Sequence, residues 1–120
     1  MNAEEIVEDL ALKARRAARS LSTATGAERK AALEAIAQAI EARSSEILAA
    51  NEIDMQHARA ENMHPQMQDR LLLTVERIKA IASGAREVAA LPDPLGQTLR
   101  KSTLPNGLEL EQISVPFGVI

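Results

Sequence analysis

Two apolar-rich runs near the end of the sequence meet at Pro105-Asn106-Gly107, and this turn constrains the fold more than any other feature. Proline fixes φ at about −65° in the first turn position, and glycine accepts the left-handed conformation that a bulged hairpin requires. Pro105 also argues against a two-residue Asn-Gly turn, because its missing N–H would cost a ladder bond there. The sequence therefore predicts a β-hairpin over residues 97–115.

The second strand of this hairpin changes its apolar phase part-way along. Leu108 and Leu110 alternate with glutamates, whereas the next apolar residues, Ile113 and Val115, have the opposite phase. Side chains alternate between the two faces of a strand, so the slip predicts a bulge near Glu111-Gln112 or a change of partner that buries opposite faces.

The rest of the chain shows helical periodicity with recognisable start signals. Asn2 with Glu5, and Thr25 with Glu28, have the spacing of capping boxes, and Thr74 is a third N-cap. These signals predict helices between Asn2 and Leu91. We expect a break at Ser44-Ser45, a short helix from Pro65 to Leu72, and an end at the prolines near Leu91, where a type I turn over 93–96 follows.

The apolar positions of these helices define the expected core. The apolar stripes predict that eight side chains are buried: Ile6, Leu10, Leu33, Ile36, Ile40, Ile78, Ile81 and Val88. Three residues of the short helix are expected to fill gaps in the core: Met67, Leu71 and Leu72. Only Phe117 is aromatic and alanine supplies much of the 46% hydrophobic content, so few side chains can bury large areas.

Composition and charge exclude several classes of protein. A net charge of −3 with both signs interspersed gives no footprint for nucleic acid or anionic membrane. The chain has no cysteine, hence no disulfide and no thiol nucleophile, and its start lacks the regions of a secretory signal. No apolar run approaches the roughly 20 residues that cross a bilayer. We expect a cytoplasmic protein.

Two clusters of charged residues have the composition of a ligand site. Asp54, His57 and Glu61 share one helix face and His64 follows, but a single helix rarely supplies the converging ligands of a metal site, so we expect a solvated face and no metal. Four bases near the end of the first helix have the placement to bind a phosphate, although complementing the helix dipole is the favoured explanation: Lys13, Arg15, Arg16 and Arg19.

Catalytic signatures do not occur in the sequence. The five glycines are too far apart for a dinucleotide or phosphate loop, and neither Gly-x-Ser-x-Gly nor His-Glu-x-x-His is present. Residue patterns alone therefore indicate a helical domain with a hairpin.

Five segments, taken together and in order, resemble the opening of gamma-glutamyl phosphate reductase, a member of the aldehyde dehydrogenase superfamily. They are ILAANEID at 47–54, DRLLLTVERI at 69–78, LPDPLG at 91–96, NGL at 106–108 and VPFGVI at 115–120. Members of that family run far past this length and carry a catalytic cysteine, which this sequence lacks.

The resemblance implies NADPH-dependent conversion of L-glutamyl 5-phosphate to L-glutamate 5-semialdehyde in proline biosynthesis. A cysteine thiolate would displace phosphate to form a thioester, and hydride from the nicotinamide would then release the semialdehyde. No residue here matches a catalytic or cofactor-contacting position of the family, so we expect the chain alone to be inactive and to bind no NADPH. Two alternatives stay open: a stand-alone helical interaction module, and a relative that acts on another acyl substrate.

The resemblance also implies an architecture, namely an α-helical N-terminal layer plus a β-hairpin within the α/β aldehyde dehydrogenase fold. Residues 1–96 would be the helical part of the cofactor-binding domain, and 97–115 a hairpin arm through which the enzyme forms a homo-oligomer. Residues 116–120 are apolar and lead into no turn, so we expect them to begin a sheet strand that continues in a longer chain.

Overall fold

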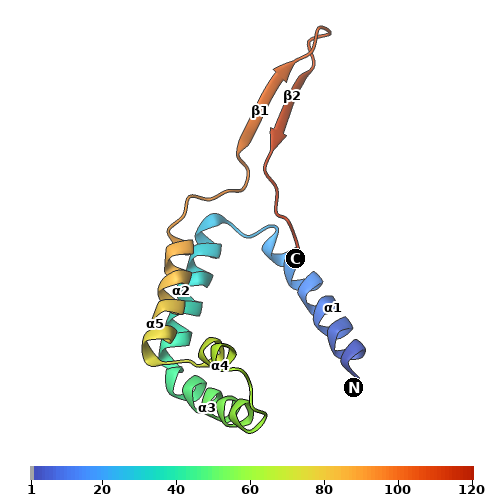
Figure 1. Ribbon diagram of the computed structural model, residues 1–120. Coiled ribbons are helices and arrows are strands. Elements are labelled where there is room, and N and C mark those ends of the chain that lie inside the picture. Colours follow the sequence, from blue (N-terminus) through green and yellow to red (C-terminus); the bar gives the residue numbers. More distant parts are fainter. Residues whose placement is uncertain (1) are drawn as a thin grey trace. The chain divides into compact units, whose positions relative to one another are not determined.

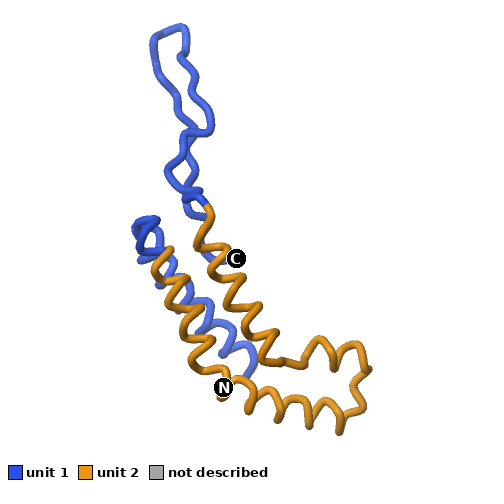
Figure 2. Tube along the Cα trace, turned by 90° about the vertical axis from the view of Figure 1, so that its left-hand side faces the viewer, with its two compact units in different colours: residues 1–29, 92–120 blue, residues 30–91 orange. Residues whose placement is uncertain are grey.

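The computed structural model describes residues 2–120, which form five helices and one two-stranded antiparallel sheet (Figure 1). The elements in chain order are α1 (Ala3–Leu21), α2 (Gly26–Ala42), α3 (Ser44–Ala60), α4 (Pro65–Leu71), α5 (Val75–Ala89), β1 (Thr98–Thr103) and β2 (Glu109–Ile113). The chain divides into two compact units (Figure 2). One contains the residues up to Arg29 together with Pro92–Ile120, and the other is Lys30–Leu91.

The helix starts confirm the predicted caps. The Asn2 side chain accepts a hydrogen bond from the Glu5 N–H at 2.8 Å, and the Glu5 carboxylate accepts one from the Asn2 N–H at 2.9 Å. Thr25 and Glu28 make the same reciprocal pair ahead of α2, and the Thr74 hydroxyl accepts from Arg77 N–H ahead of α5. Each cap satisfies N–H groups that have no partner within the helix, which fixes where the helix begins.

The break between α2 and α3 is also confirmed, although serine does not cap it. Arg43 occupies the N-cap position of α3 and makes no side-chain cap bond; its guanidinium pairs with the Glu46 carboxylate at 2.7 Å instead. Pro65 stands in the first turn of α4 as predicted, where its missing N–H costs no helical bond.

The Lys30–Leu91 unit has a small core built largely from alanine. Its buried residues are Ala37 on α2, Asn51, Met55 and Ala58 on α3, and Ile78, Ala82 and Ala89 on α5. Helices α2 and α5 lie side by side and antiparallel, and the Arg86 guanidinium of α5 joins the Glu41 carboxylate of α2 at 2.6 Å (Figures 1 and 2). Alanine lets helix backbones approach closely but buries little area, so Ile78 is the one fully buried large side chain of the described residues.

The burial predicted from the apolar stripes is largely wrong. Among the eight expected core residues only Ile78 is buried, and Leu33 and Ile40 are half-buried. The other five are exposed: Ile6, Leu10, Ile36, Ile81 and Val88. Their stripes exist as predicted, but no described residue covers them, and α1 buries no residue at all.

The prediction that apolar side chains of α4 and its C-terminal end fill gaps in the core is only partly confirmed. Met67 is 51% exposed, which contradicts its placement in the core, whereas Leu71 and Leu72 are half-buried. The short helix α4 has one side in contact with solvent along its whole length, so it cannot bury every apolar residue that it carries.

The hairpin has the turn that the sequence predicted. Gly107 has φ of +87° and donates its N–H to the Leu104 carbonyl at 2.8 Å, while Leu104 N–H donates to Leu108 O at 2.8 Å. Three residues thus form the loop, with glycine in the left-handed position that closes a bulged hairpin.

The register irregularity lies at the predicted level of the ladder but on the opposite strand. Thr98 pairs with Ile113 and Arg100 with Gln112, so the extra residue is Leu99 of β1. An additional residue on either strand would produce the same change of phase. The apolar pattern of β2 therefore predicted the position of the bulge along the ladder, but not which strand carries it. The expectation that opposite faces would be buried is not met, since every residue of both strands is exposed.

Candidate functional site

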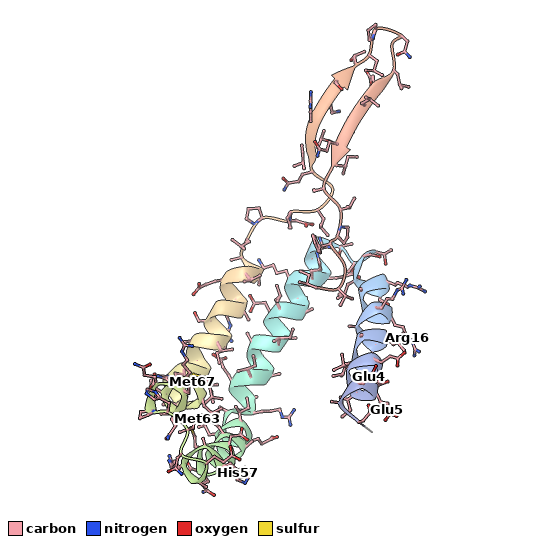
Figure 3. The ribbon with its side chains drawn as sticks, turned by 45° about the vertical axis from the view of Figure 1, so that its right-hand side comes forward. Glu4, Glu5, Arg16, His57, Met63 and Met67 are labelled. Atoms are coloured by element: carbon pink, nitrogen blue, oxygen red, sulfur yellow. The ribbon has the colours of Figure 1, made fainter. Side chains whose placement is uncertain are left out.

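The acidic and histidine side chains on α3 and at its C-cap that could have bound a metal do not form a metal site. Asp54, His57 and Glu61 are all exposed, and Figure 3 shows the labelled His57 on the solvent-facing side of α3. Within residues 2–120, no three His, Asp or Glu side chains converge closely enough to hold a metal ion.

The basic residues of α1 are only partly engaged. Lys13 pairs with Asp9 at 2.6 Å, and Arg16 projects from α1 (Figure 3). Arg15 and Arg19 line an open hollow beside Gly118 and Val119. Arg19 alone of these bases lies in the last turn, where a cation complements the helix dipole.

An open apolar hollow lies at the bend between α2 and α3. Its lining is Ile36, Ala39, Ile40, Arg43, Glu46, Ile47 and Ala50. The only charged groups there are Arg43 and Glu46, which neutralise each other. The one carboxylate of the lining is paired with Arg43 and most of the other lining side chains are aliphatic, so the chemistry of this hollow suits contact with other apolar side chains.

Residues of the motifs instead make hydrogen bonds that hold neighbouring helices or loops together, and each such set of bonds is called a joint below. Asn51, from the 47–54 motif, is 6% exposed and its amide bridges two backbone groups of the 69–78 motif. Its Nδ2 donates to Leu71 O at 2.8 Å, and its Oδ1 accepts from Leu73 N–H at 2.7 Å. One side chain thus satisfies both a donor and an acceptor at the junction of α4 and α5, where helix geometry leaves backbone groups without partners.

A second joint lies on the other side of the same junction. The Arg77 guanidinium donates to the Leu72 carbonyl at 2.7 Å, and to the Asp69 carboxylate at 2.8 Å. It also bonds the Asp69 carbonyl. Together with the Thr74 cap, these bonds hold the junction between α4 and α5 in one geometry.

The 91–96 motif forms a third joint, centred on Asp93. Its carboxylate accepts from Leu95 N–H at 3.0 Å and from Arg29 Nη2 at 2.7 and 2.8 Å. The Leu95 N–H, and after it the Arg29 guanidinium, lower the pKa of the Asp93 carboxyl from its ordinary value, so the carboxylate is ionised at neutral pH. The hydrogen bond that would close the predicted type I turn over 93–96, from Gly96 N–H to Asp93 O, is not formed, because Gly96 N–H donates to Ser114 O at 2.9 Å.

The chain is similar to known proteins along nearly its whole length. A gamma-glutamyl phosphate reductase of Kineococcus radiotolerans is 48% identical to this chain over 117 residues, and one of Leptospira interrogans is 42% identical over 116 residues. The alignments cover 98% and 97% of this chain. This chain is a homologue of part of gamma-glutamyl phosphate reductase. No family profile matches it.

Solved structures of the reductase share the fold. The enzyme from Thermotoga maritima superposes with a TM-score of 0.83 at 34% identity over 88% of this chain, and that from Saccharomyces cerevisiae with 0.81 at 30% identity over 90%. The five helices and the two-stranded sheet therefore correspond to part of the reductase fold, as the sequence resemblance implied.

The match covers nearly all of this chain but only a small part of each reductase. The chain spans 27% and 28% of the length of the two curated relatives, and 26% and 28% of the two solved chains. It contains no cysteine, and no helix among its described residues is long and apolar enough to cross a membrane.

The residues that form the joints were not recognised from the sequence, although a signal for one was present. Asn51 lies on the same helical face as Met55 and Ala58, so an amide interrupts an otherwise apolar face. A polar residue at such a position indicates a buried hydrogen-bonding role. No comparable local pattern identifies the pair of Arg29 with Asp93, which lie 64 residues apart.

Proposed function

We propose that this chain is the N-terminal part of an NADPH-dependent reductase that converts L-glutamyl 5-phosphate to L-glutamate 5-semialdehyde in proline biosynthesis. The supporting observation is 48% identity to a gamma-glutamyl phosphate reductase along 98% of the chain, while only 27% of that relative is covered. The reaction groups would then lie outside these 120 residues, and no residue named above is assigned to catalysis or to the cofactor.

The proposed chemistry explains why the chain alone would be inactive. A thiolate must displace phosphate to form the thioester that accepts hydride, and the sequence has no cysteine. Dinucleotide binding in open α/β sheets needs adjacent parallel strands and a helix N-terminus at their carboxyl ends. The described residues provide one antiparallel strand pair.

Titration with NADPH tests this proposal. We expect no saturable change in nucleotide fluorescence with the 120-residue chain at micromolar concentrations, and no semialdehyde above a no-protein control. The control is a longer protein in which these residues are followed by the remaining length of the Kineococcus relative, and it should bind NADPH and form semialdehyde. Saturable binding to the short chain, or an inactive longer protein, would contradict the proposal.

We further propose that residues 1–96 belong to the cofactor-binding domain, that 116–120 begin a strand of its sheet, and that the enzyme works in the cytoplasm. Phe117 is 88% exposed, and no residue after Ser114 has a backbone hydrogen bond in the described structure. An apolar extended run with free backbone groups is suited to pairing with another strand. Hydrogen exchange in the longer protein should protect the amides of Phe117 and Val119; unprotected amides would count against this strand.

The hairpin of residues 97–115 is proposed to be the arm through which the reductase forms a homo-oligomer. Both strands are exposed on both faces, and an isolated two-stranded ribbon is marginal in water unless something packs on it or pairs with it. Leu108 and Leu110 give this ribbon apolar contact area.

Charge placed on the arm should therefore break the assembly. In the longer protein, changing Leu108 and Leu110 together to lysine should reduce the mass seen in light scattering to that of a smaller species, because two buried ammonium groups would be unpaired. The matched control is the double change Ile53→Lys and Met67→Lys, at residues of similar exposure on α3 and α4. A wild-type mass for the hairpin variant would exclude the arm as the interface.

A further inference from the structure

The base of the hairpin is held by hydrogen bonds to both strands. The Ser114 hydroxyl, just after β2, donates to the Pro94 carbonyl at 2.6 Å and accepts from the Gln97 N–H at 3.0 Å. Backbone bonds of 2.9 and 3.0 Å join Ser114 to Gly96 and Gln97. The segment 94–97 and the end of β2 therefore move as one piece, and the two strands run side by side away from it (Figure 1).

This piece is tied to the start of α2 by one side-chain pair. Arg29 Nη2 bonds both oxygens of Asp93 at 2.7 and 2.8 Å, and its Nη1 bonds the Ala24 carbonyl. The Arg29 side chain is only 25% exposed, so the pair is partly screened from water. Asp93 in turn bonds Leu95 N–H through its carboxylate, and its carbonyl accepts from Gln97 Nε2 at 2.5 Å. An unbroken chain of bonds thus runs from α2 to the hairpin base.

Gly26 makes room for this pair. A Cβ built on Gly26 would overlap the Asp93 carboxylate and would lie 3.1 Å from its Cγ. The Asp93 carboxylate could avoid this Cβ only by rotating, and rotation would break its hydrogen bonds to Arg29 or to Leu95 N–H. The first residue of α2 must therefore lack a side chain for the pair to form.

We propose that Gly26, Arg29, Asp93 and Ser114 form a latch that holds the hairpin in one direction relative to the first turn of α2. The strands of the hairpin are exposed and contribute no packing of their own to this orientation. Near α1, Gly118 and Val119 only border an open hollow, which is a weaker restraint than a partly screened ion pair. The latch is a conformational device: it sets where the arm points, and it opens when the Arg29–Asp93 pair is broken.

The absence of cysteine allows a direct test in this chain. Spin labels on Ala27→Cys and Thr103→Cys, both exposed positions, report the distance between α2 and the hairpin by pulsed electron resonance. The unsubstituted latch should give one narrow distance distribution. Gly26→Ala and Asp93→Ala should each make it roughly twofold broader, because the hairpin base then samples several directions. Ser114→Ala should broaden it less, because it removes the hydroxyl bonds to Pro94 and Gln97 but keeps the backbone bonds of residue 114 to Gly96 and Gln97.

Gly84→Ala in α5 is the matched control, because nothing lies within 4 Å of a Cβ at that position. It should leave the distribution unchanged, and far-UV circular dichroism should show the same helix content in all variants. The latch is excluded if Gly26→Ala and Asp93→Ala both keep the narrow distribution, or if Gly84→Ala broadens it equally. Broadening by Gly26→Ala alone would exclude it too, because the pair with Arg29 would then not hold the arm.

Discussion

Replacing Asn51 by leucine is expected to lower the free energy of unfolding of this chain by roughly 2–6 kcal/mol, because two partly buried backbone groups lose their partners and each costs about 1–3 kcal/mol when unsatisfied. The groups are the Leu71 carbonyl and the Leu73 N–H, which Asn51 bonds at 2.8 and 2.7 Å. Leucine has nearly the shape of asparagine, so the change removes hydrogen bonding without opening a cavity. Urea unfolding followed by circular dichroism measures the effect.

Two further variants separate hydrogen bonding from burial at this joint. Asn51→Asp keeps the acceptor for Leu73 N–H but turns an ionised oxygen toward the Leu71 carbonyl, so it should also destabilise the chain near neutral pH and recover part of the loss in acid. Gln38→Leu changes an exposed amide that makes no described hydrogen bond, and it should alter stability by less than about 0.5 kcal/mol. Equal stability of Asn51→Leu and Gln38→Leu would mean that the bridge contributes nothing.

Local structure was predictable because its causes lie within a few residues. The caps at Asn2, Thr25 and Thr74 each depend on one polar side chain and the next three residues, and the hairpin turn depends on the conformations open to proline and glycine. Such signals do not depend on what surrounds the element. The helix boundaries and the hairpin turn accordingly agree with the sequence, whereas the type I turn predicted over 93–96 is not formed, because Gly96 N–H bonds the distant Ser114 carbonyl.

Burial was not predictable in the same way. Helical periodicity identifies which side of a helix is apolar, but not which other element covers it. Ile78 and Ile81 belong to one stripe of α5, yet Ile78 is 1% exposed and Ile81 is 50% exposed. The stripe is wider than the contact that α5 makes within residues 2–120, so neighbouring positions of equal hydrophobicity have different surroundings.

The candidate joints required partners distant in sequence. Asn51 meets residues 20 and 22 positions away, and Arg29 meets Asp93 across 64 positions. The resemblance had already drawn attention to the segments that contain Asn51 and Asp93, but without geometry it gave no role to either. Their hydrogen bonds show that these motif residues join helices and loops, which gives them a structural role in a chain that carries no cysteine.

The two isoleucines of α5 provide a prediction that links the fold to the proposed function. Ile78→Ala in this chain should lower the free energy of unfolding by about 2–5 kcal/mol, since it removes the one fully buried large side chain of the described core. Ile81→Ala should cost less than about 1 kcal/mol, because half of that side chain already faces water and alanine has the higher helix propensity. If Ile78→Ala does not fold, Ile78→Val should still cost roughly 0.5–1.5 kcal/mol by the same mechanism.

The comparison becomes decisive when the same substitutions are made in the longer protein, in which these residues are followed by the remaining length of the Kineococcus relative. If the remaining polypeptide covers the exposed side of α5, Ile81 becomes a core residue there, and the cost of Ile81→Ala should rise toward that of Ile78→Ala. Urea unfolding of both proteins measures this change, and Val75→Ala offers a second, 44% exposed position on the same helix. A cost for Ile81→Ala that stays small in the longer protein would mean that this apolar side remains solvated, and that α5 is not part of an internal layer of the enzyme.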